Sequence, residues 1–311
     1  MPYWLKRIPC TCKHLFILVC ILPFGSGYAQ KSLREFEDSL LLFQRKLYAV
    51  KNDREKLEVN RNLNSCLERA LQLEKSFEYP FDSLTEIGRL TDPDRTFRII
   101  EWDVPLNDGT HLYCGFIQSW NPKRKAFQLY PLIDKSADIK NPENYTGEAA
   151  KWYGMLYYKI IPVKSRGKKL YTLLGQRLQD KLTTKKIVDV LAFNSDGSPR
   201  FGADIFKYGK ASPKRVVFEY SAQVVMSLKY DEHLSQIVFD HLSPSEPRFE
   251  GQHQYYGPDF SVDAFQLKKG KWHYVQDVDA RNKSKQKEGK YNDPQNQGKE
   301  HEPKQFYTPK N

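Results

Sequence analysis

Apolar side chains recur at every second position in short segments between residues 96 and 276, and turn-forming sequences separate these segments. A period of two is the spacing of side chains along one face of a β-strand. The clearest alternation is the run formed by Val224, Met226, Leu228 and Tyr230. Turns that contain Gly follow such segments at residues 107–109, 165–167, 194–197 and 269–270. The pattern predicts consecutive β-hairpins.

These hairpins predict roughly ten strands, joined by short turns, in one antiparallel β domain that spans residues 96–280. Hairpins that follow one another without intervening helices are typical of an antiparallel meander. We therefore expect a mainly β fold. The pattern leaves three arrangements open, namely a barrel, a strongly curved sheet and a sandwich.

The N-terminal part of the chain has the spacing of helices instead. Ser32 and Glu35 form a capping-box sequence before an apolar pattern that reaches about residue 50, and Asn52 and Glu55 repeat it before a second helical pattern. We expect an antiparallel α-helical hairpin over residues 30–78. Pro80, Pro93 and the region of Gly88 then predict a linker over residues 79–95.

Residues 1–29 have the three parts of a secretory signal peptide. Lys6, Arg7 and Lys13 are followed by a short apolar core and by small residues at positions 27 and 29. The apolar core is too short to span a bilayer, and no later segment has a long uncharged apolar run. We expect an exported protein, periplasmic or extracellular, with no transmembrane segment after processing.

The formal net charge is +11, but much of it lies at the two ends of the chain. Residues 1–29 contribute +3 and residues 281–311 contribute +4, which leaves about +4 on the body. Phosphate binding requires a concentrated basic face, so nucleic acid is not an expected partner. The segment 281–311 has almost no aliphatic residues, which predicts a disordered basic tail.

Two cysteines, Cys66 and Cys114, remain after the leader. In an oxidising compartment they could form a disulfide between the helical hairpin and the β domain. The alternative is two buried thiols that pack as small apolar groups. Neither cysteine has a histidine or another cysteine at the spacing of a zinc site, and the sequence predicts no metal.

The densest group of chemically active residues lies between residues 240 and 263. Its histidines and carboxylates are Asp240, His241, Glu250, His253, Asp259 and Asp263. Such a set could bind a divalent metal, or act as acid and base on a hydrolysable bond. Strand alternation argues against a joint role for the adjacent pair, since Asp240 and His241 would point to opposite faces. A histidine held in the core is the simpler interpretation.

Exposed aromatic residues could stack on sugar rings or another ligand. The candidates are Trp152, Tyr255 and Tyr256, with Asp259 as a polar neighbour. An aromatic-rich β core predicts the same residues, because such rings bury a large apolar area. The mature chain contains no phosphate-binding loop, zinc helix or nucleophile elbow, and the sequence predicts no cofactor.

Several short motifs resemble those of a family of uncharacterised secreted proteins from Bacteroidota. They are residues 152–160 (Trp-Tyr-Gly, then Tyr-Tyr-Lys-Ile), 171–175, 239–244 and 256–259, together with a leader that ends at residues 28–30. The resemblance would cover most of residues 80–280. It implies an envelope location and assigns no activity or functional residue.

The leading hypothesis is a non-enzymatic envelope protein whose β module binds a ligand or partner, either an envelope protein or a glycan. In this hypothesis the helical hairpin serves for docking or capping. One alternative is a hydrolase of an envelope polymer that uses His241, His253 and nearby carboxylates. Another is a structural subunit of a surface assembly. The oligomeric state cannot be derived from the sequence.

Overall fold

The computed structural model describes residues 32–278, so the expected signal peptide and basic tail lie outside the described residues. Two helices begin this range, α1 (Leu33–Ala49) and α2 (Asp53–Leu71), as the capping sequences predict. At α1 the capping box is complete: Ser32 Oγ accepts from Glu35 N, and Ser32 N donates to Glu35 Oε2 at 2.6 Å. At α2 the Asn52 side chain caps Glu55 N.

The strands form three sheets. The first sheet contains β1 (Gly88–Thr91), β2 (Phe97–Pro105), β3 (His111–Asn121) and β4 (Ala126–Ile133), in that order. The second sheet has the order β5 (Gly147–Glu148), β9 (Pro199–Phe201), β8 (Thr183–Phe193), β7 (Lys168–Leu178) and β6 (Leu156–Ser165), and β11 (Val216–Ser221) also pairs with β8. The third sheet has the order β10 (Phe206–Lys207), β15 (Lys271–Val275), β14 (Tyr256–Lys268), β13 (Gln236–Pro244) and β12 (Leu228–Asp231).

Every strand pair is antiparallel except the two-residue contact of β10 with β15. This confirms the mainly β, antiparallel fold with an N-terminal helical hairpin. The sheets do not close into a barrel, so of the three expected arrangements the sandwich and the curved sheet remain. Hairpins dominate because each predicted turn reverses the chain between neighbouring strands.

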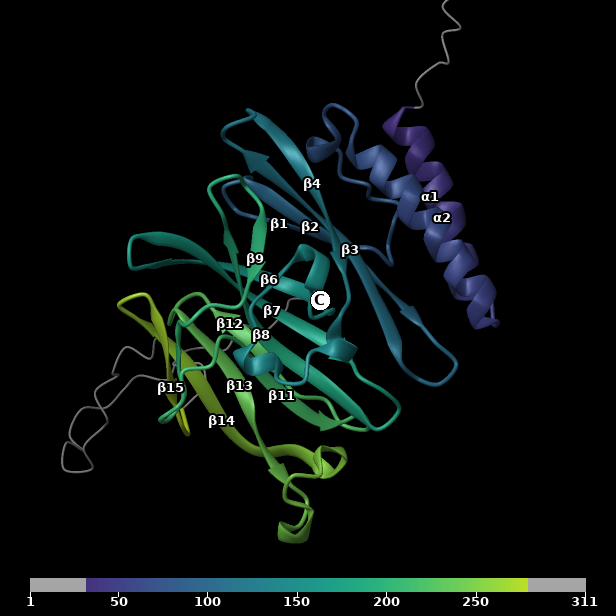
Figure 1. Cartoon of the computed structure of the whole chain (residues 1–311). Coiled ribbons are helices and arrows are strands. Elements are labelled where there is room, and N and C mark those ends of the chain that lie inside the picture. The colour runs from purple at the N-terminus through teal and green to yellow at the C-terminus, as the bar shows by residue number, and fades with distance from the viewer. Residues whose placement is uncertain (1–31, 279–311) are drawn as a thin grey trace, which may run out of the picture.

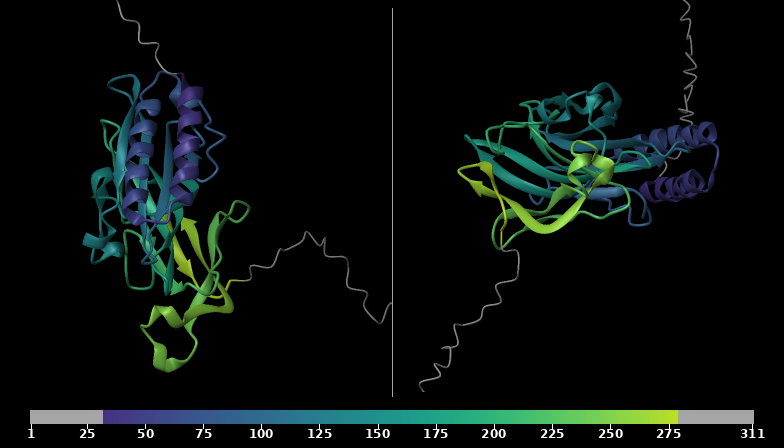
Figure 2. Two further views of the ribbon diagram at one scale, coloured as in Figure 1. Left: turned by 90° about the vertical axis from the view of Figure 1, so that its right-hand side faces the viewer. Right: turned by 90° about the horizontal axis from the view of Figure 1, so that it is seen from below.

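Three apolar clusters separate four layers. One lies between the helical hairpin and the first sheet, one between the first and second sheets, and one between the second and third sheets. In Figure 1 the layers follow one another from the helices at upper right to β13–β15 at lower left, and Figure 2 shows α1 and α2 side by side over the first sheet. Strand β2 lies inside the stack and is covered on both faces. Ile99 therefore faces the cluster between the first and second sheets, while Ile100 and Trp102 face the cluster between the helices and the first sheet.

The helical hairpin is an integral layer of this fold. Leu40, Leu63 and Leu67 are buried with Trp102 and Phe116 in a single cluster. Asn60 of α2 fixes the contact, since its Oδ1 accepts from Trp102 Nε1 at 2.7 Å. None of the helices within residues 32–278 is long and apolar enough to cross a membrane.

The structure differs from the sequence expectations in two segments. The expected linker 79–95 contains the edge strand β1 and buries Phe81, Leu84 and Ile87 against the helices. Residues 224–227 precede β12, and Val224 is 39% exposed although Met226 and Leu228 are buried. In both segments tertiary packing decides where the strand begins to pair, and the local alternation of side chains does not reveal that packing.

Candidate functional site

Three hairpin turns of different strands meet around a groove. They connect β3 to β4, β6 to β7, and β8 to β9, and the groove has a volume of about 990 Å³. Its lining includes Trp120, Arg166, Lys168, Lys169, Tyr171, Phe193, Arg200 and Asp204. We call this site the hairpin groove. Its volume is within the range of ligand-binding sites.

Hydrogen bonds between two of the turns give the groove a fixed wall. Ser119 Oγ donates to Gly197 O at 2.7 Å, and Asn121 Nδ2 donates to Asp196 O at 2.6 Å. Gly197 has φ +80, and a Cβ atom there would lie 3.1 Å from Trp120 O. Glycine is suited to this position, because a side chain would be strained and would also press on the β3–β4 turn.

The groove carries an exposed indole. Trp120 is 42% exposed and packs edge-to-face on Phe127, with ring centroids 5.3 Å apart. The other tryptophans in the described range, Trp102, Trp152 and Trp272, are buried. An aromatic ring that is braced on one side and open on the other is a platform for stacking.

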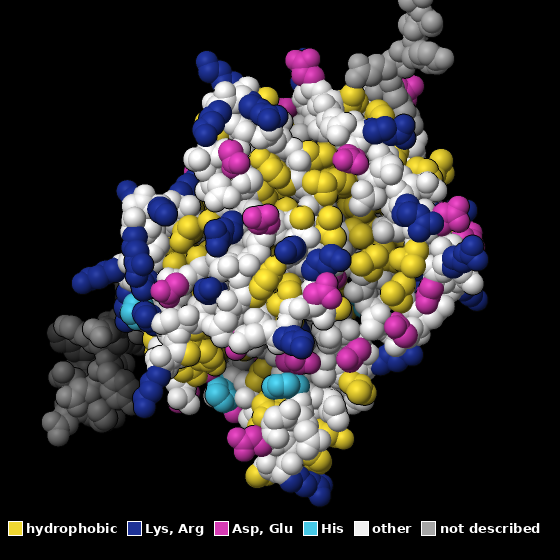
Figure 3. All heavy atoms as spheres, in the orientation of Figure 1, with side chains coloured by type: hydrophobic (Ala, Val, Ile, Leu, Met, Phe, Trp, Pro, Cys, Tyr) yellow, Lys and Arg dark blue, Asp and Glu magenta, His cyan; other side chains and the backbone are white. Residues whose placement is uncertain are grey.

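The rim of the groove is cationic. Arg166, Lys168 and Arg200 are exposed, and none of their side chains forms an ion pair or hydrogen bond with another residue of the described range. Lys169 differs, because its Nζ contacts Asp94 and lies 5.0 Å from the centroid of the Tyr171 ring. Figure 3 shows Lys and Arg side chains along the left side, where Figure 1 places the β6–β7 hairpin. Asp204 is the acidic residue of the lining, so cations outnumber carboxylates there and the groove favours anions.

Within residues 240–263 the structure brings His241 and Asp263 together. His241 Nδ1 lies 2.7 Å from Asp263 Oδ2, and Asp263 also accepts from Tyr274 Oη at 2.7 Å and from Asp277 N at 3.0 Å. The hydrogen bond to Asp263 raises the pKa of His241, and burial opposes it. The histidine is 34% exposed at its side chain, so its Nε2 could exchange protons with solvent.

Among the other members of this group, Asp259 lies near enough to His241 for its charge to raise the pKa of the histidine. Asp240 accepts from Ser227 N at 2.7 Å, on the β12 side of its strand, whereas His241 contacts Asp263 of β14. Glu250 and His253 belong to the segment between β13 and β14, which projects from the body at the bottom of Figure 1. Within residues 32–278 no three His, Cys, Asp or Glu side chains form a group that could hold a metal ion.

The aromatic candidates have mainly structural contacts. Trp152 is fully buried and donates from Nε1 to Tyr157 Oη at 3.1 Å, so it is a core residue and not a ligand platform. Tyr255 is 41% exposed but stacks on Phe249 with centroids 4.1 Å apart. Tyr256 Oη accepts from Gly251 N at 2.9 Å.

The carboxylate of the polar candidate Asp259 also forms hydrogen bonds within its own segment. Its Oδ1 accepts from Ser261 N at 3.1 Å and from Ser261 Oγ at 2.7 Å. These hydrogen bonds lower the pKa of Asp259 against an opposing burial effect. The carboxylate therefore stabilises its own turn within β14.

The two cysteines of the described range, Cys66 and Cys114, are buried and are not joined by a disulfide. Both belong to the cluster between the helices and the first sheet, and Asn60 Nδ2 donates to Cys114 Sγ at 3.3 Å. Burial raises the pKa of the Cys114 thiol to about 11. The structure thus has the second of the two expected arrangements, the buried thiols.

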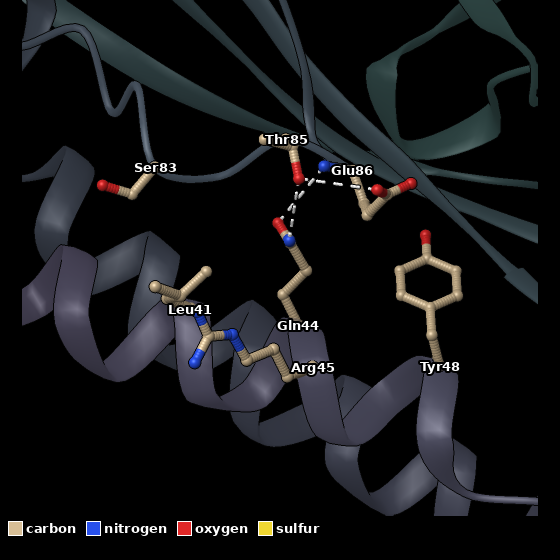
Figure 4. A pocket seen from close by; sticks show the side chains of 7 residues that line it. All are labelled: Leu41, Gln44, Arg45, Tyr48, Ser83, Thr85 and Glu86. Atoms are coloured by element: carbon tan, nitrogen blue, oxygen red, sulfur yellow. Dashed lines mark hydrogen bonds between the residues drawn. The ribbon is translucent and has the colours of Figure 1, made fainter.

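A polar cleft of about 650 Å³ lies between α1 and residues 83–86 (Figure 4). Gln44 points into it, with Nε2 3.5 Å from Thr85 Oγ1 and Oε1 accepting from Glu86 N at 3.4 Å. Tyr48, at the other end, donates from Oη to Asp103 O at 3.2 Å. These polar groups form hydrogen bonds within the protein, and those of Gln44 hold residues 83–86 against α1.

Sequence reasoning did not identify Trp120, Arg166, Lys168 or Arg200. A signal was present, because all four lie in or beside turns, and the turns of alternate hairpins in a meander lie at one end of the sheet. The signal was incomplete because the β3–β4 turn belongs to another sheet.

Comparisons of the chain with protein-family models, curated proteins and solved structures find no match.

Proposed function

We propose that this chain is an exported cell-envelope protein that binds an acidic glycan in the hairpin groove and performs no chemistry on it. Export rests on the leader pattern of residues 1–29, and the resemblance to secreted proteins of Bacteroidota stays a prediction. The observation that carries the binding proposal is the exposed indole of Trp120 among the unpaired cations Arg166, Lys168 and Arg200.

Each chemical component of an acidic glycan has a counterpart in the groove. The apolar face of a sugar ring can stack on Trp120, and a uronate carboxylate can accept paired hydrogen bonds from an arginine fork. Asn194, Ser195 and Ser165 also line the groove and offer hydrogen-bonding groups to sugar hydroxyls. A nucleic acid fits less well, since the body carries only about +4 of the net charge.

The test is titration of the purified protein with uronate oligosaccharides and with their carboxyl-reduced forms. Trp120 is the exposed tryptophan of the described range, so binding to the wild type should change its fluorescence. Isothermal titration measures binding in every variant, including the one that lacks this indole. We expect Trp120→Ala to abolish measurable binding, and Arg166→Gln with Arg200→Gln to weaken it about tenfold or more. Tyr255→Ala, an exposed aromatic outside the groove, should bind as the wild type does. Equal binding of the charged and reduced forms, or an unaffected Trp120→Ala variant, contradicts the proposal.

A second candidate, the polymer hydrolase, has one observation in its favour. The contact between His241 and Asp263 orients an imidazole whose Nε2 could act as a base. Chromatography of the same oligosaccharides after long incubation would reveal new reducing ends. Cleavage that is lost in His241→Asn would favour the hydrolase over the binding protein.

A further inference from the structure

A second pocket, of about 560 Å³, lies at the other end of the strands that form the hairpin groove. His111, Arg177 and Lys185 line it, and each lies eight residues along its strand from a residue of the groove. Eight residues of extended chain span roughly 25 Å. The two sites are therefore separate, and we call this one the arginine pocket.

The guanidinium of Arg177 is held rigidly at the wall of the pocket. Nη1 donates to Asp134 Oδ2 at 3.1 Å and to Gly154 O at 2.6 Å, and Nε donates to Gln179 Oε1 at 3.2 Å. Its carbon Cζ lies 4.7 Å from the ring centroid of Tyr113 and 5.6 Å from that of Tyr153. The second terminal nitrogen, Nη2, has no hydrogen-bond partner among the described residues. A guanidinium fixed in this way can bind an anion with little loss of side-chain entropy.

A second cation stands near Arg177. Lys185 Nζ is 3.2 Å from Glu219 Oε2 and 3.4 Å from Tyr153 Oη, which leaves donor capacity on the ammonium group. Lys140 is a further, exposed cation of the lining, and Asp134 is its acidic member. Asp134 is already neutralised by Arg177, with which it forms an ion pair that is largely buried. Because Asp134 pairs with Arg177 and Glu219 pairs with Lys185, the excess of positive charge at the pocket comes from Lys140.

One part of the lining is apolar, and it is formed by Leu106, Leu112, Ile139 and Pro142. The lining also contains polar residues such as Thr110 and Ser136. Sites of this kind, apolar with a few convergent polar groups, bind small organic molecules. An inorganic anion would leave the apolar wall unused, whereas an organic anion can contact both parts.

We propose that the arginine pocket binds a small organic carboxylate, with the carboxylate at Arg177 and Lys185 and the apolar body against Leu112 and Ile139. The proposal goes beyond glycan binding and does not depend on it, because the two sites share no residue. Arg177 supplies the geometry of the site, and Lys185 supplies charge.

Isothermal titration of the purified protein with benzoate, hexanoate, benzyl alcohol and inorganic phosphate tests the proposal. We expect saturable binding of the two carboxylates, and binding of benzyl alcohol and phosphate at least about tenfold weaker. Absence of carboxylate binding, equal binding of benzyl alcohol, or binding of phosphate alone overturns it.

Variants locate the binding. Arg177 itself is a poor choice, because its loss would also release Asp134 and the Gly154 carbonyl. Lys185→Gln and the exposed Lys140→Glu should each weaken benzoate binding several-fold or more, and Lys168→Gln in the hairpin groove should leave it unchanged. If both pocket variants bind benzoate like the wild type, the site is not the arginine pocket. Uronate binding should survive Lys140→Glu, so the two proposals can fail separately.

Discussion

Arg215 and Asp189 form an ion pair in which both side chains are completely buried, with Arg215 Nη2 2.9 Å from Asp189 Oδ1. Asp189 also accepts from Tyr157 Oη at 3.0 Å, and Arg215 Nη1 donates to Pro142 O at 2.9 Å. The pair joins β8 to the segment before β11 in the second sheet. Arg215 Nε has no partner, which shows that the burial is not fully compensated.

Removing one member of this pair should cost more than removing both. Arg215→Met leaves the Asp189 carboxylate buried without its counterion, and we expect a loss of about 3–5 kcal/mol in the free energy of unfolding. The double variant Arg215→Met with Asp189→Leu should be more stable than the single one. Urea denaturation measures both. A single variant within about 1 kcal/mol of the wild type would contradict this view of the pair.

Glu101 should be protonated in the folded protein. Burial raises its pKa well above the ordinary 4.5, Oε1 accepts from Tyr157 N, and Oε2 has no partner. Between 4.5 and the raised value the folded state binds more protons than the unfolded state, so stability should fall as pH rises through that window. Glu101→Gln should remove this pH dependence and equal or exceed the wild type in stability above it. Thermal unfolding of both proteins between pH 4 and 9 is the measurement, and identical pH slopes would refute the assignment.

His241 should titrate above its ordinary pKa of 6.5 because it is hydrogen-bonded to Asp263. The stability gained from the protonated imidazole is complete below 6.5 and is lost as pH rises through the raised folded value. Asp263→Asn should lower the pKa of His241, and Asp259→Asn should lower it less. Asp240→Asn is the matched control, because that carboxylate bonds to Ser227 N instead. NMR titration of the imidazole Cε1–H resonance reports all three, and an unchanged pKa in Asp263→Asn would exclude the hydrogen bond as the cause.

The helical hairpin should be required for stability. Leu63 is fully buried between α2 and the first sheet, whereas Leu42 on α1 is 66% exposed. Leu63→Ala should lower the free energy of unfolding by about 2–5 kcal/mol, and Leu42→Ala should change it by less than about 0.5 kcal/mol. Chemical denaturation compares the two. Equal, small effects would contradict the role of the hairpin as a stabilising layer of the fold.

Gly154 should tolerate no side chain. A Cβ atom there would lie 2.4 Å from Asp134 Cγ and 2.7 Å from Tyr113 Cβ, so Gly154→Ala should destabilise the protein by about 1–3 kcal/mol. Gly257→Ala is the control, since its nearest neighbour, a methyl group of Val224, is 3.6 Å away. Melting temperatures distinguish the two. A Gly154→Ala protein as stable as the Gly257→Ala protein would show that the contact with Asp134 can relax.

Local sequence signals predicted the elements whose causes are local. The capping residues Ser32 and Asn52 mark the starts of both helices, and the turns at 107–109 and 269–270 join the strands expected on either side. These predictions hold because a cap or a tight turn involves residues only a few positions apart. The edge strand β1 was missed because its four residues, which begin at Gly88 and end shortly before Pro93, show too little alternation to indicate a strand.

By itself the sequence determined the fold class and the helical hairpin, since each follows from the period of side chains along one element. Only the tertiary structure decided which partners meet: Asp263 with His241, Tyr113 and Tyr153 around Arg177, and three turns around Trp120. Those contacts depend on how separate sheets stack, and the stacking is set by the packing of whole apolar faces. No local pattern in the chain specifies which faces will pack together.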